Sequence, residues 1–364
     1  MKKIMIIFGT RPEAIKMCPL IIELKACKKF QVIVCVTGQH REMLDQVLDC
    51  FGITTEYDFC VMKPFQNLFD ITINIMSKVK DVMITEKPDI VLVHGDTTTT
   101  FISSLAAFYL GIKIGHIEAG LRTYDISSPF PEEFNRRATS LVASYHFAPT
   151  KTAKNNLIRE GTNENLIYIT GNTSIDALKT TVKSNYQHRL LDWAKNNRLI
   201  MVTAHRRENL GKPLQNMFLA IKKIVDKYHK IKVIYPVHLN PLIKNTAYKV
   251  FGDHERIKLI DPLDVLDFHN FLARSYLVLT DSGGIQEEAT SLGKPVLVMR
   301  NTTERPEGVE SGTLKLVGTE SSTIYSAFDL LLSNFSEYKK MSKKLDLYGD
   351  GKASKKIARI LHHL

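Results

Sequence analysis

The sequence predicts an α/β fold with two doubly wound, Rossmann-like domains. Short apolar runs alternate with helical segments along the chain, and this alternation occurs in two successive series. Such a pattern is typical of parallel sheets that are covered by helices on both faces. The length of 364 residues also exceeds the usual size of a single hydrophobic core, so two domains are expected.

The first series of apolar runs predicts an amino-terminal domain over residues 1–170. Its strands are expected at Ile4–Phe8, Val32–Val36, Ile90–Val93, Ile112–Ile117, Tyr145–Ala148 and Leu166–Thr170. The second series predicts a carboxy-terminal domain over residues 171–345. Its strands are expected at Leu199–Thr203, Lys232–Tyr235, Ile257–Ile260, Tyr276–Thr280 and Pro295–Met299. Residues 346–364 should end in a helix that packs back on the first domain.

Three carboxyl-bearing residues of the first domain stand at chain breaks. Asp96 follows the third predicted strand, Glu118 follows the fourth, and Glu132 opens a helix after the turn at 127–131. Ligands of open α/β sheets bind at this edge, so three acids there predict acid/base chemistry. Asp96 could instead only cap the next helix, and Glu132 or Glu133 could only complement a helix dipole. Glu118 has no capping role and needs pairing or solvation.

The loop at 9–13 has the composition of an anion site. Pro12 suits the first turn of a helix, so the free amides of the loop and Arg11 should face a bound anion. The loop lacks the G-x-G-x-x-G pattern, and the chain has no Walker-type phosphate loop. Nicotinamide and Walker-type nucleotide binding are therefore not expected, and no cofactor is predicted.

A second candidate phosphate site follows a strand of the other domain, at residues 281–288. Ser282 and two glycines open a helix there, so they could bind a diphosphate while Glu288 accepts hydrogen bonds from a ribose. Ser282 could alternatively be only a helix cap. The cluster His205-Arg206-Arg207 lies at another strand end. Core packing does not require so many polar groups there, so the cluster favours a functional role.

Composition excludes several classes of protein. The net charge of +11 comes from scattered basic residues without a run of five, which favours an anionic small molecule over nucleic acid. The first apolar run is too short for a signal peptide or a membrane span, so a soluble cytoplasmic protein is expected. The five cysteines show no CxxC spacing, which suits a reducing compartment. No histidine pair has the spacing of a metal site, so no metal is predicted.

The motifs together resemble the bacterial non-hydrolysing UDP-N-acetylglucosamine 2-epimerases. They extend over the whole chain and include FGTRPEAIKM, TGQHREMLDQV, VHGDTTTT, GHIEAGLRT, SPFPEEFNRR, TGNTSIDAL, TAHRREN, YPVHLNP, TDSGGIQEE and TTERPEGVE. The resemblance implies a GT-B-like fold whose domains face each other across a cleft. It also implies reversible inversion at carbon 2 of UDP-N-acetylglucosamine, which gives UDP-N-acetylmannosamine for surface polysaccharides, in a homodimer without membrane or nucleic-acid partners.

The resemblance assigns roles to individual residues. The acid/base set would be Asp96, Glu118, Glu132 and His205. The UDP-binding set would be Arg11, Lys16, Phe268, Ser282, Gly283, Gly284 and Glu288. An allosteric site for a second substrate molecule would use Gln39, Glu42, Gln66, Arg206 and His238. The resemblance implies a glutamine at position 42 and an arginine at position 65 in relatives that are activated. This chain has Glu42 and Phe65 there, so its site should offer fewer donors to an anion and bind it more weakly.

Other functions stay open at this point. A GT-B glycosyltransferase would use the same sugar nucleotide but pass the sugar to an acceptor. A hydrolysing epimerase would release free N-acetylmannosamine and UDP. A nucleic-acid-binding protein is the remaining non-enzyme alternative, although the chain has no basic stripe with interleaved aromatic residues.

Overall fold

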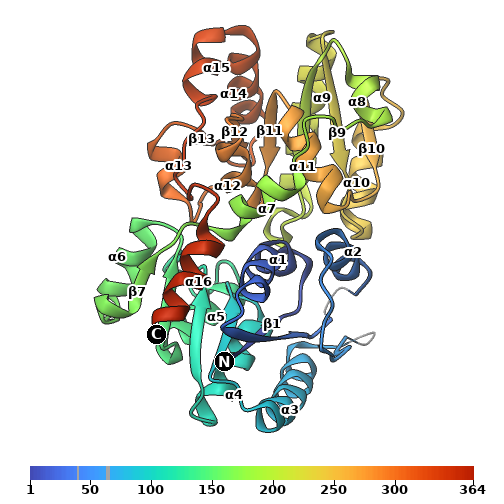
Figure 1. Cartoon of the computed structure of the whole chain (residues 1–364). Helices are drawn as coiled ribbons and strands as arrows, with labels where there is room; N and C mark the ends of the chain where they lie inside the picture. Colours follow the sequence, from blue (N-terminus) through green and yellow to red (C-terminus); the bar gives the residue numbers. More distant parts are fainter. Residues whose placement is uncertain (39–40, 63–65) are drawn as a thin grey trace. The chain divides into compact units, whose positions relative to one another are not determined.

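The computed structural model describes residues 1–38, 41–62 and 66–364, which form two compact units (Figure 1). Unit 1 comprises Met1–Lys179 and Tyr348–Leu364, and unit 2 comprises Thr180–Leu347. The chain therefore leaves the first unit after Lys179, whereas the sequence placed this boundary after residue 170. Within the described residues, the structure contains no helix long and apolar enough to cross a membrane.

Unit 1 is built on a seven-stranded parallel sheet in the order β3-β2-β1-β4-β5-β6-β7. Its strands are β1 (Lys2–Phe8), β2 (Phe30–Val36), β3 (Tyr57–Asp58), β4 (Ile90–His94), β5 (Lys113–Ile117), β6 (Tyr145–Ala148) and β7 (Ile167–Ile169). Its helices are α1 (Arg11–Ala26), α2 (Arg41–Phe51), α3 (Leu68–Glu86), α4 (Thr98–Tyr109), α5 (Glu132–Val142), α6 (Lys151–Arg159), α7 (Thr173–Thr181), which ends just past the unit boundary, and α16 (Ala353–His363), with a 3-10 turn at Glu164–Leu166.

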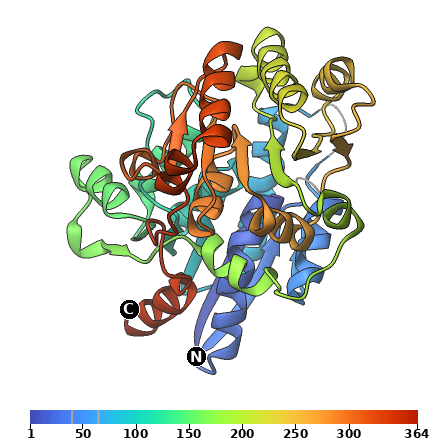
Figure 2. The same cartoon turned by 90° about the horizontal axis from the view of Figure 1, so that it is seen from above.

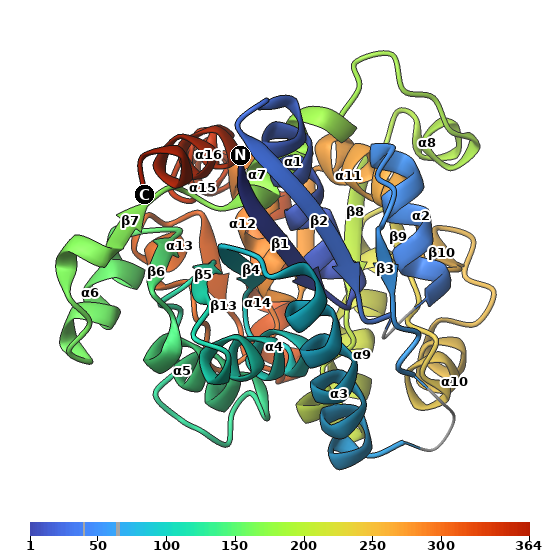
Figure 3. The same cartoon turned by 60° about the horizontal axis from the view of Figure 1, so that its bottom comes forward.

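Helices cover both faces of this sheet. Figure 3 shows α3, α4 and α5 side by side on one face, and α1 and α16 on the other. Helix α1 begins with a capping box, in which Thr10 and Glu13 satisfy each other's backbone amides. The final helix packs against α1 within unit 1, and Lys2 Nζ donates to the Leu361 carbonyl at 2.9 Å. The two chain ends consequently lie close together, as Figures 1 and 2 show.

Unit 2 repeats this plan with a six-stranded parallel sheet in the order β10-β9-β8-β11-β12-β13. Its strands are β8 (Arg198–Thr203), β9 (Ile231–Pro236), β10 (Ile257–Ile260), β11 (Leu277–Thr280), β12 (Val296–Val298) and β13 (Leu314–Leu316). Its helices are α8 (Arg189–Ala194), α9 (Lys212–Lys227), α10 (Pro241–Phe251), α11 (Val265–Arg274), α12 (Gly283–Ser291), α13 (Pro306–Glu310), α14 (Ser321–Ser333) and α15 (Phe335–Met341), with a 3-10 turn η2 at Arg207–Asn209. One core lies between the sheet and α9, α10 and α14, and the other lies between the sheet and α8, α11 and α12.

The predicted α/β class is confirmed, and every predicted strand is present. The two strands that the sequence did not predict are β3 and β13, which are short and lie at sheet edges. In each sheet the strand order reverses direction beside the first strand, between β1 and β4 in unit 1 and between β8 and β11 in unit 2. Ligands of doubly wound sheets bind at the carboxyl ends of strands at such switch points.

Candidate active site

A buried carboxylate, Glu13, joins the two loops at the switch point of unit 1. It accepts hydrogen bonds from the amides of Gly9 and Thr10 at 3.1 and 2.8 Å. It also accepts from the hydroxyls of Thr10 and Thr97, at 2.7 and 2.8 Å. Burial raises the pKa of Glu13, and these donors act in the opposite direction. The protein's own carboxylate thus takes the amides of Gly9 and Thr10, so these two amides do not face a bound anion. The predicted role of Arg11 in anion binding stays a prediction.

Asp96 lies next to this junction and does not cap α4. The cap is Thr97, whose side chain accepts from the amide of Thr100 at 3.1 Å. The Asp96 carboxylate instead pairs with Arg136 of α5 at 2.5 Å, and its carbonyl accepts from Asn135 of the same helix at 2.9 Å. The structure therefore rules out the simple capping role and ties Asp96 to the helix that begins at Glu132.

Glu118 follows β5 in a backbone conformation that L-residues rarely adopt. Its φ is +64°, in the left-handed region, although it is not a glycine. Its side chain is only 6% exposed and pairs with the ammonium of Lys16. Asn172 donates to the same carboxylate oxygen at 2.5 Å, and His94 Nε2 lies 3.9 Å from it. A strained residue that is held from several sides indicates a functional constraint.

Lys16 and His94 give this carboxylate its electrostatic environment. Lys16, a residue expected to bind UDP, forms an ion pair with Glu118 inside unit 1. Burial lowers the pKa of His94 to about 4, with Lys16 acting in the same direction and Glu118 opposing it. His94 is therefore neutral near pH 7, and the positive charge beside Glu118 comes from Lys16.

The structure separates the roles of the adjacent acids Glu132 and Glu133. Glu133 is fully buried and accepts from the amides of Thr123 and Tyr124, both at 3.1 Å, and from Arg136 at 3.2 Å. It therefore organises the loop that precedes α5. Glu132 has a buried oxygen, Oε2, without a hydrogen-bond partner in the described part of the chain. A buried carboxyl oxygen left unsatisfied is costly, which favours a role toward a ligand.

In unit 2, a buried carboxylate again fastens the loops at the switch point. Asp281 follows β11 and accepts from the amides of His205 and Arg206 at 3.0 and 2.9 Å. It also accepts from Asn209 Nδ2 at 3.0 Å. Burial lowers the pKa of His205, with Asp281 opposing the shift. Asp281 thus fixes the loop that carries His205 directly beside Ser282.

At the start of α12, Ser282 and the two glycines that follow it have different surroundings. Ser282 occupies the cap position but its hydroxyl makes no capping hydrogen bond, so the simple capping alternative is wrong. A Cβ on Gly283 would lie 2.5 Å from Nη1 of Arg305, which explains why no side chain fits there. A Cβ on Gly284 would meet no atom of the described residues within 4 Å. Protein packing does not require Gly284, so the space beside it is available to a ligand.

Arg305 belongs to a chain of ion pairs, buried except at Glu208, that sequence reasoning missed. It pairs with Glu287 of α12 at 2.8 Å and with Glu304 at 3.3 Å. Glu304 also pairs with the fully buried Arg300 at 3.2 Å, and Arg300 pairs with Glu208 of η2 at 2.9 Å. This chain connects the helix after Ser282 to the turn after His205. The motif TTERPE contains an acid and an arginine side by side, but their partners lie too far away in sequence to be inferred.

The residues expected at the nucleoside end also lie together. Glu288 of α12 is buried, with its carboxylate 3.6 Å from Nε2 of His269 on α11. His269 in turn contacts the ring of Phe268, with the ring centroids 6.2 Å apart. Glu288 and Phe268, which are predicted to contact the ribose and the uracil, thus both lie next to His269.

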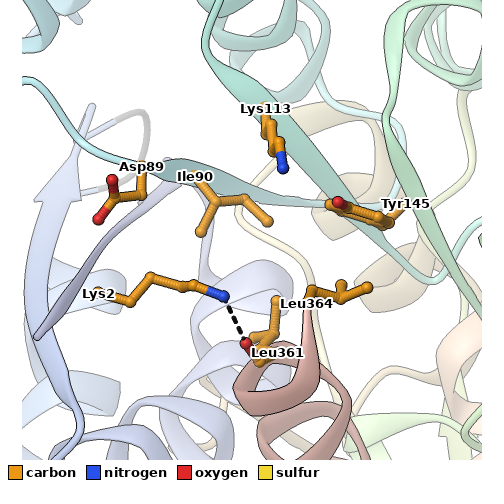
Figure 4. A pocket seen from close by; sticks show the side chains of 7 residues that line it. All are labelled: Lys2, Asp89, Ile90, Lys113, Tyr145, Leu361 and Leu364. Carbon is orange, nitrogen blue, oxygen red and sulfur yellow. Dashed lines mark hydrogen bonds between the residues drawn. The ribbon is translucent and has the colours of Figure 1, made fainter.

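A cavity in unit 1 lies away from these residues (Figure 4). It is lined by Lys2, Asp89, Ile90, Lys113, Tyr145, Leu361 and Leu364. Most of its lining comes from the first residues of β1, β4, β5 and β6. The candidate site is at the opposite, carboxyl ends of the strands. Among the described residues, no group of three or more His, Cys, Asp or Glu side chains could hold a metal ion.

Comparison with known proteins decides the family. The sequence model of a family described as UDP-N-acetylglucosamine 2-epimerase matches residues 22–362. A Bacillus subtilis (strain 168) protein named UDP-N-acetylglucosamine 2-epimerase is 56% identical over 359 residues, which cover 99% of this chain and 94% of the relative. The chain belongs to the UDP-N-acetylglucosamine 2-epimerase family.

Solved structures share the fold of this epimerase-family protein. The S. aureus MnaA co-structure with UDP has a TM-score of 0.96 and 52% identity, covering 100% of this chain and 96% of that one. The Neisseria meningitidis UDP-GlcNAc 2-epimerase bound to UDP-GlcNAc has a TM-score of 0.95 and 48% identity, with 100% of both chains covered. The predicted GT-B-like fold with two α/β domains is confirmed.

The candidate activator residues of this epimerase-family protein are described only in part. Arg206 follows His205 directly, and the ring of His238 stacks on that of His205 with centroids 5.9 Å apart. Gln66 belongs to unit 1. Gln39 lies outside the described residues, as does the side chain of Glu42. The structure thus brings together His205 and His238, with Arg206 beside them in the chain.

Proposed function

We propose that this protein interconverts UDP-N-acetylglucosamine and UDP-N-acetylmannosamine and releases no free sugar. The observation that carries the proposal is the set of acids at the carboxyl ends of β4 and β5. Glu118 is held in a strained conformation, Asp96 is tied to α5, and Glu132 at the start of α5 has an unsatisfied oxygen. Membership in the epimerase family and the names of the relatives support the same substrate.

The chemistry explains why such acids are needed. The proton on carbon 2 is not next to a carbonyl, so it is not acidic in the bound substrate. When the bond from carbon 1 to the phosphate oxygen breaks, the developing oxocarbenium ion acidifies this proton, and a carboxylate can remove it. The products of this step are a 2-acetamidoglucal and UDP. Addition of UDP back to carbon 1, with protonation of carbon 2 from the opposite face, completes the inversion.

The roles of unit 1 and unit 2 follow from their residues. Asp96, Glu118 and Glu132 of unit 1 would exchange protons with the sugar. In unit 2, the first turn of α12 would hold the diphosphate, because the first amides of a helix have no acceptor within the helix and Gly284 leaves space. Phe268 and Glu288 would contact the nucleoside, and His205 would assist at the departing phosphate. The S. aureus structure named with UDP supports this nucleotide.

The test is incubation with UDP-N-acetylglucosamine, followed by proton NMR. We expect UDP-N-acetylmannosamine to appear and to reach the same ratio from either direction. Free N-acetylmannosamine with a stoichiometric amount of UDP would instead identify a hydrolysing epimerase. Consumption of the sugar nucleotide only in the presence of an acceptor would identify a glycosyltransferase.

We also propose that the chain forms a homodimer through the face of unit 1 covered by α3, α4 and α5. These helices expose large apolar side chains: Phe69, Ile73, Phe108, Tyr109 and Leu141, the last of them 85% exposed. Large apolar side chains exposed on three neighbouring helices favour a protein partner, and a second copy of this chain is the partner that the sequence resemblance implies. Light scattering should give the mass of a dimer, and Leu141→Lys with Ile73→Lys should give a monomer.

Finally, we propose that a second molecule of UDP-N-acetylglucosamine activates the enzyme weakly. Arg206 and His238 beside His205 support a site for an anionic activator. Glu42 and Phe65 occupy positions where the resemblance implies a glutamine and an arginine in activated relatives. The chain therefore offers fewer hydrogen-bond donors to that anion. Phe65 lies outside the described residues, so this part of the proposal rests on the sequence alone.

A further inference from the structure

Asn172 is a buried residue between β7 and α7 that sequence reasoning did not select. Its Nδ2 donates to Oε2 of Glu118 at 2.5 Å. Its Oδ1 accepts from the amide of Ser174 at 3.0 Å, and its own amide donates to the carbonyl of Tyr348 at 2.7 Å. Because Oδ1 is held by the Ser174 amide, the side chain presents its NH2 group, and not its oxygen, to Glu118.

Glu118 depends on its neighbours for its orientation. Its left-handed φ costs on the order of 1–2 kcal/mol, which other contacts must offset. The groups that face it come from three elements: Lys16 from α1, His94 from β4 and Asn172 before α7. A Cβ added to Gly95 would lie 3.4 Å from its Oε1. Of these, Lys16 and Asn172 both address Oε2, and both favour the ionised carboxylate.

We infer that Asn172 is a positioning residue, which holds the Glu118 carboxylate in place and in its ionised form through the Nδ2–Oε2 hydrogen bond. This inference rests on the proposed function, in which Glu118 exchanges a proton with carbon 2. The hydrogen bond from the Ser174 amide caps α7 and needs only a side-chain oxygen at position 172. The hydrogen bond to Glu118 needs a side-chain N–H donor at the same position, which the capping role does not require. Asparagine satisfies both requirements, whereas aspartate would satisfy only the first.

The substitution Asn172→Asp separates the two roles. It keeps the capping oxygen but places a second carboxylate against Glu118, which disfavours ionisation of that residue. We expect kcat at pH 7 to fall by roughly 10- to 100-fold, with the acidic limb of the kcat profile displaced by about one pH unit or more to higher pH. KM and the affinity for UDP should stay within about twofold. Asn172→Ala should displace the profile in the same direction by less.

Asn156→Asp is the matched control. Asn156 Nδ2 donates to the carbonyl of Gly120 at 3.0 Å, and its Oδ1 accepts from Tyr124 at 2.9 Å. The change therefore removes one hydrogen bond that α6 donates to the loop after Glu118 and keeps an acceptor contact, but it does not alter a bond to the Glu118 carboxylate. We expect the pH profile of this variant to coincide with that of the wild type.

Two results would overturn the inference. One is a loss of kcat in Asn172→Asp that is the same at every pH, which would indicate a structural role only. The other is a further loss of the same size when Asn172→Asp is added to Glu118→Gln, because a residue that acts through Glu118 has nothing left to position there.

The inference can be tested even if the proposed function fails. A wild-type protein without epimerase activity would refute the function but leave the hydrogen bond in question. Carbon-13 NMR titration of the Glu118 carboxyl group, assigned with Glu118→Gln, then decides. Its midpoint should move to higher pH in Asn172→Asp and Asn172→Ala, and an unchanged midpoint would refute the positioning role.

Discussion

The two glycines of α12 give different predictions: Gly283→Ala should lower the stability of unit 2, whereas Gly284→Ala should lower the affinity for UDP. In Gly283→Ala, the new Cβ would lie 2.5 Å from Nη1 and 2.9 Å from Cζ of Arg305. The guanidinium cannot move away freely, since it pairs with Glu287 at 2.8 Å and with Glu304 at 3.3 Å. Overpacking of this kind costs about 1–3 kcal/mol, and rupture of a buried ion pair costs more. The helix gains at most about 1 kcal/mol from alanine, so unit 2 should lose stability.

In Gly284→Ala, the new Cβ meets no described atom within 4 Å. We expect the free energy of unfolding to stay equal or to rise by up to about 1 kcal/mol, because alanine favours the helix over glycine. The methyl group would occupy the space proposed for the diphosphate. UDP affinity should therefore fall at least tenfold, which corresponds to about 1.4 kcal/mol.

Urea unfolding followed by circular dichroism gives the stabilities, and titration calorimetry gives the UDP affinities. The two variants serve as controls for each other, since they differ by one position in the same turn. Unchanged UDP affinity in a folded Gly284→Ala protein would refute the placement of the diphosphate at α12. If Gly283→Ala is as stable as the wild type, the Arg305 guanidinium can move away from the new Cβ at little cost, which contradicts the rigidity inferred from its ion pairs.

Three other predictions concern catalysis, acid stability and regulation. Glu118→Gln or Glu132→Gln should lower kcat by about two to four orders of magnitude with UDP affinity retained, and near-normal turnover would refute their roles. Burial lowers the pKa values of His94, His116 and His146 to about 4, 3 and 4, so the stability of unit 1 should be complete above about pH 6.5. Below that pH the free energy of unfolding should fall by up to about 1.4 kcal/mol per pH unit for each histidine, because the unfolded chain binds protons that the buried histidines do not. A urea midpoint that stays constant between about pH 6.5 and 5 would contradict this prediction. Initial rates from UDP-N-acetylmannosamine should rise on addition of UDP-N-acetylglucosamine, with higher activator affinity in Phe65→Arg; full activity without activator would refute the regulation.

The sequence predicted the strands well because most of them are buried. The first strand of each sheet contains a continuous apolar run, at residues 4–8 and 199–202, and such runs are visible without knowledge of the partners. Strand β3, at the edge of its sheet, has only the two residues Tyr57–Asp58, so it leaves no comparable pattern. The turn at Gly171, where the sequence predicts the boundary between the domains, lies inside unit 1, and the chain leaves that unit after Lys179.

The sequence predicts the candidate site from residues at strand ends. It does not predict the residues that form hydrogen bonds to these strand-end loops. Glu13 and Asn172 act on Thr97 and Glu118, which lie far away in the sequence. The capping-box spacing of Thr10 and Glu13 was a usable local signal, and it would have shown that Glu13 takes loop amides. No local signal identified Asn172, because its partner becomes a neighbour only when β5 and β7 join one sheet.

The origin of the hydrogen on carbon 2 of the product tests the central claim most directly. The protein is incubated with UDP-N-acetylglucosamine in deuterated water, and the UDP-N-acetylmannosamine formed is isolated and examined by proton NMR and mass spectrometry. Elimination and re-addition through a carboxyl group open to solvent exchange predict deuterium at carbon 2. UDP-N-acetylmannosamine that retains the original proton at carbon 2 would contradict the proposed proton transfer through the acids of unit 1.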